Sequence, residues 1–98
     1  MNNYLLNSED LKLLSNKLAE WEITKTRIRR VWQFKNFIEA FGFIAKVAMI
    51  SEAMNHHPEL SNIYRTVTIE LTTHDLGGLS SLDVQLAQAI DSLQPELN

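Results

Sequence analysis

The spacing of apolar residues changes along this chain from a strand period to a helix period and back, and these changes constrain the fold. Residues 28–34 carry Ile, Arg, Trp and Phe at every second position, which is the periodicity of a β-strand. From residue 35 to residue 54 apolar side chains recur at three- and four-residue steps, which predicts a long helix. Pro58 disfavours helical geometry at His57, so this helix should end before the two histidines.

Two shorter elements precede the strand. Ser8, followed by two acidic residues, predicts the start of a helix over residues 8–19, because its side chain can accept from free backbone N–H groups. Trp21 and Ile23, one residue apart, predict a short strand. A turn at residues 24–26 should then join it to the next strand as an antiparallel pair.

The long helix should cover the sheet with one apolar stripe. We expect its aromatic residues to belong to a packed core in preference to a cofactor pocket. The stripe expected to face the core consists of Phe37, Phe41, Ile44, Ala45 and Ala48.

A second strand with clear alternation is predicted over residues 63–71. It places Val67, Ile69 and Leu71 on one face and polar residues on the other. A fourth strand lies either within residues 63–73, bent at the middle, or in an extended stretch that leads out of the histidine loop. The pattern leaves both alternatives open.

The last predicted element is a helix that follows a turn at Gly77-Gly78. Ser80 and Asp83 resemble a capping box in which Asp replaces the usual Glu. The helix should stop near Pro95.

Composition excludes several functional classes. The chain has 98 residues, which suits one domain over residues 1–98. Its net charge of −3 gives no electrostatic reason to expect nucleic acid or an anionic membrane as a direct partner. It has no cysteines, which excludes thiolate catalysis and thiolate metal sites. No apolar run approaches the roughly 18 residues that span a bilayer, and no secretion signal is recognisable, so we expect a cytoplasmic protein.

All three histidines lie in two short segments at the ends of one predicted strand. His56 and His57 precede the strand 63–71, and His74 follows it. Because the unperturbed pKa of histidine lies near neutrality, this grouping favours acid–base chemistry. The alternative is that they are ordinary loop or surface histidines.

Other kinds of chemistry are less well supported. Three imidazoles and a water could form a zinc site, but His56 and His57 would point to opposite sides of an extended backbone. The serines lie in no nucleophile motif, and Gly77-Gly78 alone is too nonspecific for a phosphate loop. We therefore predict proton transfer without a metal site.

A His-His-Pro-Glu segment at residues 56–59 is followed downstream by Thr-His and then by Gly-Leu-Ser. With these motifs the chain, over residues 11–93, resembles the pterin-4a-carbinolamine dehydratases. The other matching residues are Trp21, Phe34, Lys35, Asn36, Phe37, Ala40, Phe41, Gly42, Phe43, Val47, Ala48, Glu52, Tyr64, Val67, Leu71, Thr72 and Asp83.

The resemblance implies an α+β fold, with a four-stranded antiparallel sheet and three helices packed on one face. It also implies a homo-oligomer, either a dimer or a tetramer. The implied activity is that of a lyase, which dehydrates 4a-hydroxytetrahydropterin (4a-hydroxytetrahydrobiopterin) to quinonoid dihydropterin after an aromatic amino acid hydroxylase has used tetrahydropterin. The family requires no metal or organic cofactor.

The catalytic positions implied by the resemblance are His56, His57 and His74. Loss of hydroxide requires a proton on oxygen and the loss of a proton from a ring nitrogen, and imidazoles can serve both needs. We expect His56 and His74 to exchange protons with the leaving hydroxyl while His57 holds the pterin.

Four further residues are candidates for substrate binding. Glu52 and the backbone of Thr72 and Thr73 could bind the amide-like edge of the pterin, and Trp21 could wall the pocket. Glu52 could equally be a solvated residue late in the helix, and Trp21 could equally be a core residue.

Two positions depart from the family pattern. Leu60 stands where many members have Trp, and Asn55 stands where several have Asp. Leu60 puts pterin affinity in doubt, and Asn55 removes a charge that could raise the pKa of a neighbouring imidazole.

The alternative function is a non-catalytic binding or assembly module. Animal members of the family also act as dimerisation cofactors for a homeodomain transcription factor. The three histidines favour catalysis, because a scaffold would not need them.

Overall fold

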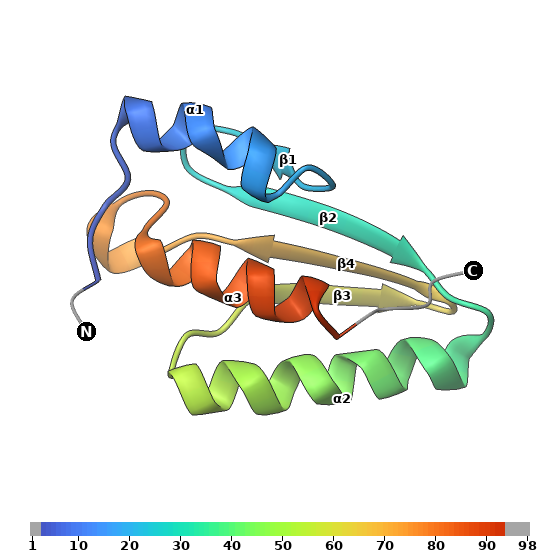
Figure 1. Cartoon of the computed structure of the whole chain (residues 1–98). Coiled ribbons are helices and arrows are strands. Elements are labelled where there is room, and N and C mark those ends of the chain that lie inside the picture. The colour runs from blue at the N-terminus through green and yellow to red at the C-terminus, as the bar shows by residue number, and fades with distance from the viewer. Residues whose placement is uncertain (1–2, 94–98) are drawn as a thin grey trace.

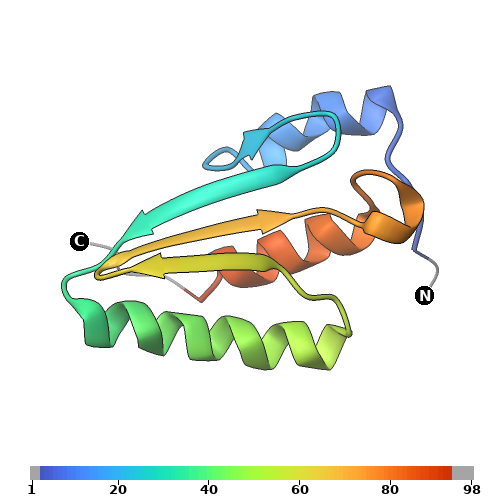
Figure 2. The same ribbon diagram turned by 180° about the vertical axis from the view of Figure 1, so that it is seen from behind.

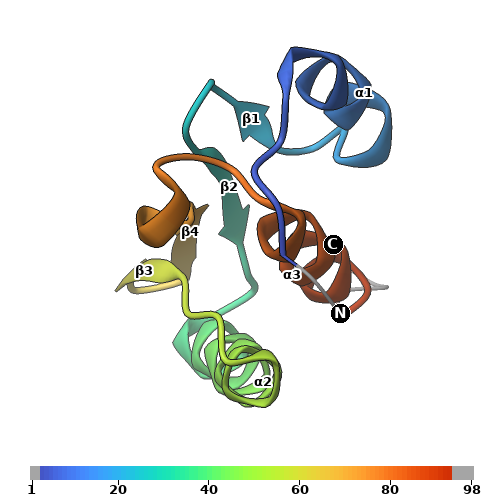
Figure 3. The same cartoon turned by 90° about the vertical axis from the view of Figure 1, so that its left-hand side faces the viewer.

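In residues 3–93, which the computed structural model describes, three α-helices lie along one face of a four-stranded antiparallel sheet (Figures 1 and 3). This confirms the α+β class and the predicted layers. The elements in chain order are α1 (Ser8–Lys17), β1 (Glu22–Ile23), β2 (Ile28–Gln33), α2 (Phe37–Met54), β3 (Glu59–Ile63), β4 (Thr66–Leu71), the 3₁₀ turn η1 (His74–Leu76) and α3 (Ser81–Asp91).

The strands are arranged in the order β1-β2-β4-β3, and every neighbouring pair is antiparallel. The predicted hairpin of β1 and β2 is confirmed. The fourth strand is β3, which leads out of the histidine loop, so the second of the two alternatives is correct. Figure 2 shows β2, β4 and β3 from the face that the helices leave open.

Strand β4 is an inner strand of the sheet, because it pairs with β2 on one side and with β3 on the other. The expectation that residues 63–71 form one strand is therefore wrong. Ile63 belongs to β3, and Tyr64 turns the chain with a positive φ of 51°. The strands that lie at the edges are β1 and β3.

Alternation along the strands places the core between sheet and helices. Val67, Ile69 and Leu71 of β4 are buried, as predicted. Trp32 of β2 is also buried, and its ring packs against Phe43 of α2 with 5.0 Å between ring centroids. Burial of such side chains supplies the main stabilising free energy of so small a sheet.

The predicted core stripe of α2 is wrong. The buried residues of this helix are Ala40, Phe43, Val47 and Ser51, whereas four of the five predicted residues, Phe37, Phe41, Ala45 and Ala48, are exposed. Ile44 is half-buried and packs against the core. The error has a physical reason, because α2 is apolar around most of its circumference and periodicity cannot select one face of such a helix.

The helix ends agree with the predictions to within a few residues. Helix α1 is capped by Asn7, one residue before the predicted Ser8, because the Asn7 side chain accepts from the backbone N–H of Asp10 at 2.8 Å. Helix α3 is capped by Ser80 as predicted and ends at Asp91. Pro95 lies outside the described residues. None of the described helices combines the length and apolarity needed to cross a membrane.

Candidate active site

The two histidine segments lie at the same end of the molecule as the start of α3. Helix α2 ends there, η1 follows β4 there, and α3 begins there, at the left of Figure 1. His56 and His57 follow α2 directly, and His74 opens η1. The fold therefore places the predicted catalytic residues at the meeting of three elements.

Asn55 directs the chain out of α2 and toward the site. It adopts a left-handed conformation with φ of 52°, which Asn tolerates better than most residues. Its backbone N–H donates to the carbonyls of Ser51 and Glu52, and the N–H of His56 also donates to Ser51 at 3.1 Å. Asn55 thus serves as the C-cap of α2.

His56 contacts a buried carboxylate. Its Nε2 lies 2.5 Å from Oδ1 of Asp83, which is fully buried, and the His56 side chain is 11% exposed. An ionised carboxylate only accepts hydrogen bonds, so we assign the hydrogen to Nε2 and the lone pair of the neutral ring to Nδ1.

The other two histidines face solvent beside carboxylates of their own. Nε2 of His57 lies 2.9 Å from Oε1 of Glu52. His74 is 77% exposed, and its Nε2 lies 3.9 Å from Oε2 of Glu59. Within residues 3–93, each of the three histidines therefore has an acidic neighbour, and of these three carboxylates Asp83 beside His56 is the buried one.

Glu59 links the histidine loop to a cluster of charges on the open face of the sheet. Nη1 of Arg27 lies 3.4 Å from Glu59 and 2.6 Å from Glu70. The hydrogen bond to Glu70 and the negative charge of Glu59 raise the pKa of Arg27. Arg27 thus stays cationic beside the carboxylate that approaches His74.

Thr72 and Thr73 form hydrogen bonds with other residues of the chain. The Thr72 hydroxyl donates to the carbonyl of Thr26 at 2.6 Å. The backbone N–H of Thr73 donates to Gly78, and its carbonyl accepts from Leu76 and Gly78. The Thr73 backbone, expected to hold the pterin edge, is thus already hydrogen-bonded in the η1 loop.

Trp21 is a core residue in this structure. Its indole N–H donates to Asp91 at 2.9 Å, and its ring packs edge-on against Trp32 with 5.6 Å between centroids. Asp91 ends α3, whereas Asp83, the partner of His56, begins it. These contacts do not bring Trp21 to the histidines.

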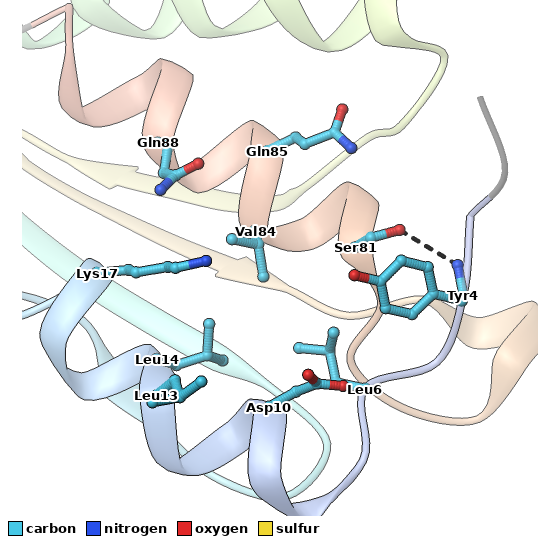
Figure 4. Close-up of a pocket in the computed structure, with 10 residues that line it drawn as sticks. All are labelled: Tyr4, Leu6, Asp10, Leu13, Leu14, Lys17, Ser81, Val84, Gln85 and Gln88. Atoms are coloured by element: carbon cyan, nitrogen blue, oxygen red, sulfur yellow. Dashed lines mark hydrogen bonds between the residues drawn. The ribbon is translucent and has the colours of Figure 1, made fainter.

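A separate hollow of about 220 Å³ lies between α1 and α3 (Figure 4). Its apolar floor includes Leu14 and Val84, and the backbone N–H of Tyr4 donates to Ser81 at its edge at 3.2 Å. None of the predicted site residues lines it. Among residues 3–93, no group of three or more His, Asp or Glu side chains is placed to hold a metal ion.

Sequence reasoning missed the role of Asp83. We expected it to cap α3, and its Oδ2 does accept the backbone N–H of Ser80 at 2.9 Å. The same carboxylate uses Oδ1 for His56. Its presence among the residues of the family resemblance was the available signal, but the capping pattern gave it a sufficient local explanation.

Known proteins resemble this chain over nearly its whole length. The family model described as pterin 4 alpha carbinolamine dehydratase matches residues 4–93. A protein of Prochlorococcus marinus (strain MIT 9303) is 57% identical over 91 residues. The match covers 93% of this chain and 95% of that protein, and the name of the protein assigns it provisionally to the pterin-4-alpha-carbinolamine dehydratases. A protein of Synechococcus sp. (strain WH7803) with the same name is 57% identical over 89 residues, covering 91% of this chain and 96% of its own.

Solved structures agree in fold. The crystal structure of a transcriptional coactivator/pterin dehydratase from Brucella melitensis has a TM-score of 0.87 and 32% identity, and the match covers 92% of this chain and 98% of that one. A pterin dehydratase-like protein, identified as a RuBisCO assembly factor in the alpha-carboxysome, shares the fold with a TM-score of 0.63 and 19% identity over 78% of this chain and 88% of its own.

The fold is that of a small α+β domain, and the family model and the relatives place this domain among the dehydratases. The chain belongs to the pterin-4a-carbinolamine dehydratase family, and similarity assigns it the corresponding lyase activity, with a pterin as the implied substrate.

Proposed function

We propose that this chain dehydrates 4a-hydroxytetrahydropterin to quinonoid dihydropterin by acid–base catalysis at histidine, with no metal ion or organic cofactor in the step. The observation that carries the proposal is the contact between His56 and the buried Asp83. A carboxylate in this position orients an imidazole and stabilises it when it is protonated.

In the proposed step His56 and His74 are the two proton carriers. An imidazolium gives a proton to the hydroxyl group, the carbon–oxygen bond breaks, and the oxygen leaves as water. The adjacent ring nitrogen loses its proton to a neutral imidazole, and its electron pair forms the new carbon–nitrogen double bond. Each positioned transfer contributes about a hundred- to ten-thousand-fold in rate.

His57 and Glu52 are proposed to hold the substrate. Their side chains are paired at 2.9 Å and both face solvent, so a pterin ring can reach them without disturbing the core. The backbones of Thr72 and Thr73 and the side chain of Trp21 stay candidates for the same role. Thr73 and Trp21 are the weaker ones, because the Thr73 backbone and the Trp21 indole already form internal hydrogen bonds.

Replacement of the two proton carriers tests the mechanism. His56→Ala and His74→Ala should each slow turnover by at least about tenfold, because each removes a proton donor and acceptor. Asp75→Ala is the matched control, since it changes an exposed neighbour in the same 3₁₀ turn. Wild-type rates in both histidine variants would remove the basis of the mechanism.

We also propose that the chain forms a homo-oligomer, either a dimer or a tetramer. Ile38 and Met49 on the outer face of α2 are 80% and 66% exposed, and a Cβ placed at Gly42 of the same helix would meet nothing within 4 Å. Strand β3 adds an unpaired edge. Apolar surface and an open edge of this kind favour association.

The alternative function, a binding or assembly module, draws support from the same outer face of α2. The Brucella melitensis relative is described as a transcriptional coactivator as well as a pterin dehydratase. A protein that binds a partner through α2 and lacks dehydratase activity would fit this alternative. A cytoplasmic location, expected from composition, stays a prediction that cell fractionation would check.

A further inference from the structure

Three polar side chains that are hydrogen-bonded to one another, and to His56 through Asp83, are buried. Asp83 and Ser80 are fully buried, and Thr73 is 8% exposed. They come from separate positions: Thr73 precedes η1, Ser80 caps α3, and Asp83 lies in the first turn of α3. A buried carboxylate is costly unless hydrogen bonds satisfy it, so the donors around Asp83 decide how firmly it is held.

The hydrogen bonds among these side chains have a definite direction. The Thr73 hydroxyl donates to Oδ2 of Asp83 at 2.8 Å. Oγ1 of Thr73 also lies 2.6 Å from Oγ of Ser80. A hydroxyl carries one hydrogen, and Thr73 has given its own to Asp83, so Ser80 must be the donor in the second bond. The result is a chain that runs from Ser80 through Thr73 to Asp83.

The two oxygens of Asp83 therefore have different partners. Oδ2 accepts from the Thr73 hydroxyl and from the backbone N–H of Ser80, while Oδ1 faces Nε2 of His56. Donors on both oxygens fix the plane of the carboxylate, and bonds to a charged acceptor are stronger than neutral ones. In a buried site each donor in a chain also polarises the next.

Asp83 is the carboxylate that contacts His56 among the described residues. Of the other carboxylates near the histidines, Glu52 pairs with His57, and Glu59 lies near His74 and Arg27. The hydrogen-bonded orientation of His56 thus depends on Asp83, and that of Asp83 depends on the two hydroxyls.

We propose that Thr73 and Ser80 are positioning residues for the reaction, because their directed hydroxyl chain locks Asp83 and thereby keeps His56 in the tautomer with hydrogen on Nε2 and the lone pair on Nδ1. This inference rests on the proposed function, in which His56 carries a proton. It gives the Thr73 side chain a role different from the pterin contact expected for its backbone.

The test measures the tautomer of His56 and the rate of dehydration separately. Long-range proton–nitrogen NMR spectra of neutral His56 should show the Nε2–H form in the wild-type protein. Thr73→Val keeps the shape of the side chain but removes the hydroxyl, so it should produce a mixture of tautomers and lower kcat about tenfold, with KM changed less than about twofold. Thr73→Ser should restore both readings.

Ser80→Ala is the second variant, because it removes only the far end of the chain and leaves the Ser80 backbone N–H in place. It should also produce a mixture of His56 tautomers and lower kcat, by a smaller factor than Thr73→Val does. The His57 and His74 signals serve as internal controls and should not change. An unchanged Nε2–H signal of His56 in folded Thr73→Val and Ser80→Ala would overturn the proposal.

The two hypotheses fail in different ways. A tautomer shift in a protein that has no dehydratase activity would uphold the hydroxyl chain and contradict the proposed reaction. Full loss of activity in His56→Ala, together with an unchanged tautomer and kcat in the Thr73→Val and Ser80→Ala variants, would support the proposed reaction and contradict the role of the hydroxyl chain.

Discussion

At the scale of single residues, Asp83 joins the stability of the fold to the chemistry of the site. It accepts from Thr73 and from the backbone of Ser80, and it contacts His56, all without exposure to solvent. A residue that satisfies a helix end and also contacts the proposed proton carrier has two separate reasons to be an aspartate.

Asp83→Asn should therefore lower both stability and activity. An amide nitrogen cannot accept a hydrogen bond, so at least one buried donor loses its partner, at a cost of about 1–3 kcal/mol. His56 loses its anionic partner, and turnover should fall by at least about tenfold. Urea unfolding and the dehydration rate measure the two effects.

Asp10 provides a matched control for this substitution. It occupies the same N3 position in α1, where it accepts the backbone N–H of Asn7 at 3.0 Å at the surface. Asp10→Asn should cost only about 0.3–1 kcal/mol and leave the rate unchanged. Equal losses of stability and activity in the two variants would contradict the special role of Asp83.

The three histidines of the candidate site were singled out from the sequence, but the buried polar side chains that contact His56 directly or through Asp83 were not. The grouping of the histidines in two segments needed no distances. The contact of Asp83 with His56 joins positions 27 residues apart, and the Thr73–Ser80 bond depends on how the η1 loop closes. Only the folded chain brings such groups together.

At the scale of elements, β3 and α2 are where sequence patterns were least informative. The residues of β3 are exposed or half-buried throughout, so this edge strand has no buried apolar face to mark it. Helix α2 has the opposite problem, because apolar residues on both faces hide the true core stripe. Strands β2 and β4 alternate cleanly because each buries one face. The position of β2 was predicted closely, whereas for β4 the buried residues were predicted but not the residue at which the strand begins.

A single charged substitution can test whether the outer face of α2 takes part in self-association. Met49→Lys should weaken self-association by at least about tenfold, because a buried lysine ammonium is costly at an apolar contact. It should change the free energy of unfolding of the monomer by less than about 0.5 kcal/mol, since Met49 faces solvent there. Dilution in analytical ultracentrifugation measures the first effect.

Lys46→Gln is the control on the same helix, because Lys46 is also exposed and the substitution exchanges one polar end group for another. It should leave association unchanged. If Met49→Lys also leaves association unchanged, α2 is not part of the interface.

At the scale of the whole molecule, the small size of the chain is the reason to test the proposed self-association. A chain of 11.3 kDa buries a modest fraction of its surface on folding. Sedimentation at micromolar concentration should give about two or four times the chain mass. A single species near 11.3 kDa would contradict the proposed oligomer.

In the proposed function the chain is a dehydratase in which histidines move the protons. The most direct measurement is the decay of 4a-hydroxytetrahydropterin in the presence of the purified protein and excess chelator, compared with buffer alone. Faster decay with chelator present is the predicted result. No acceleration, or an acceleration that vanishes with chelator and returns with added zinc, would contradict it.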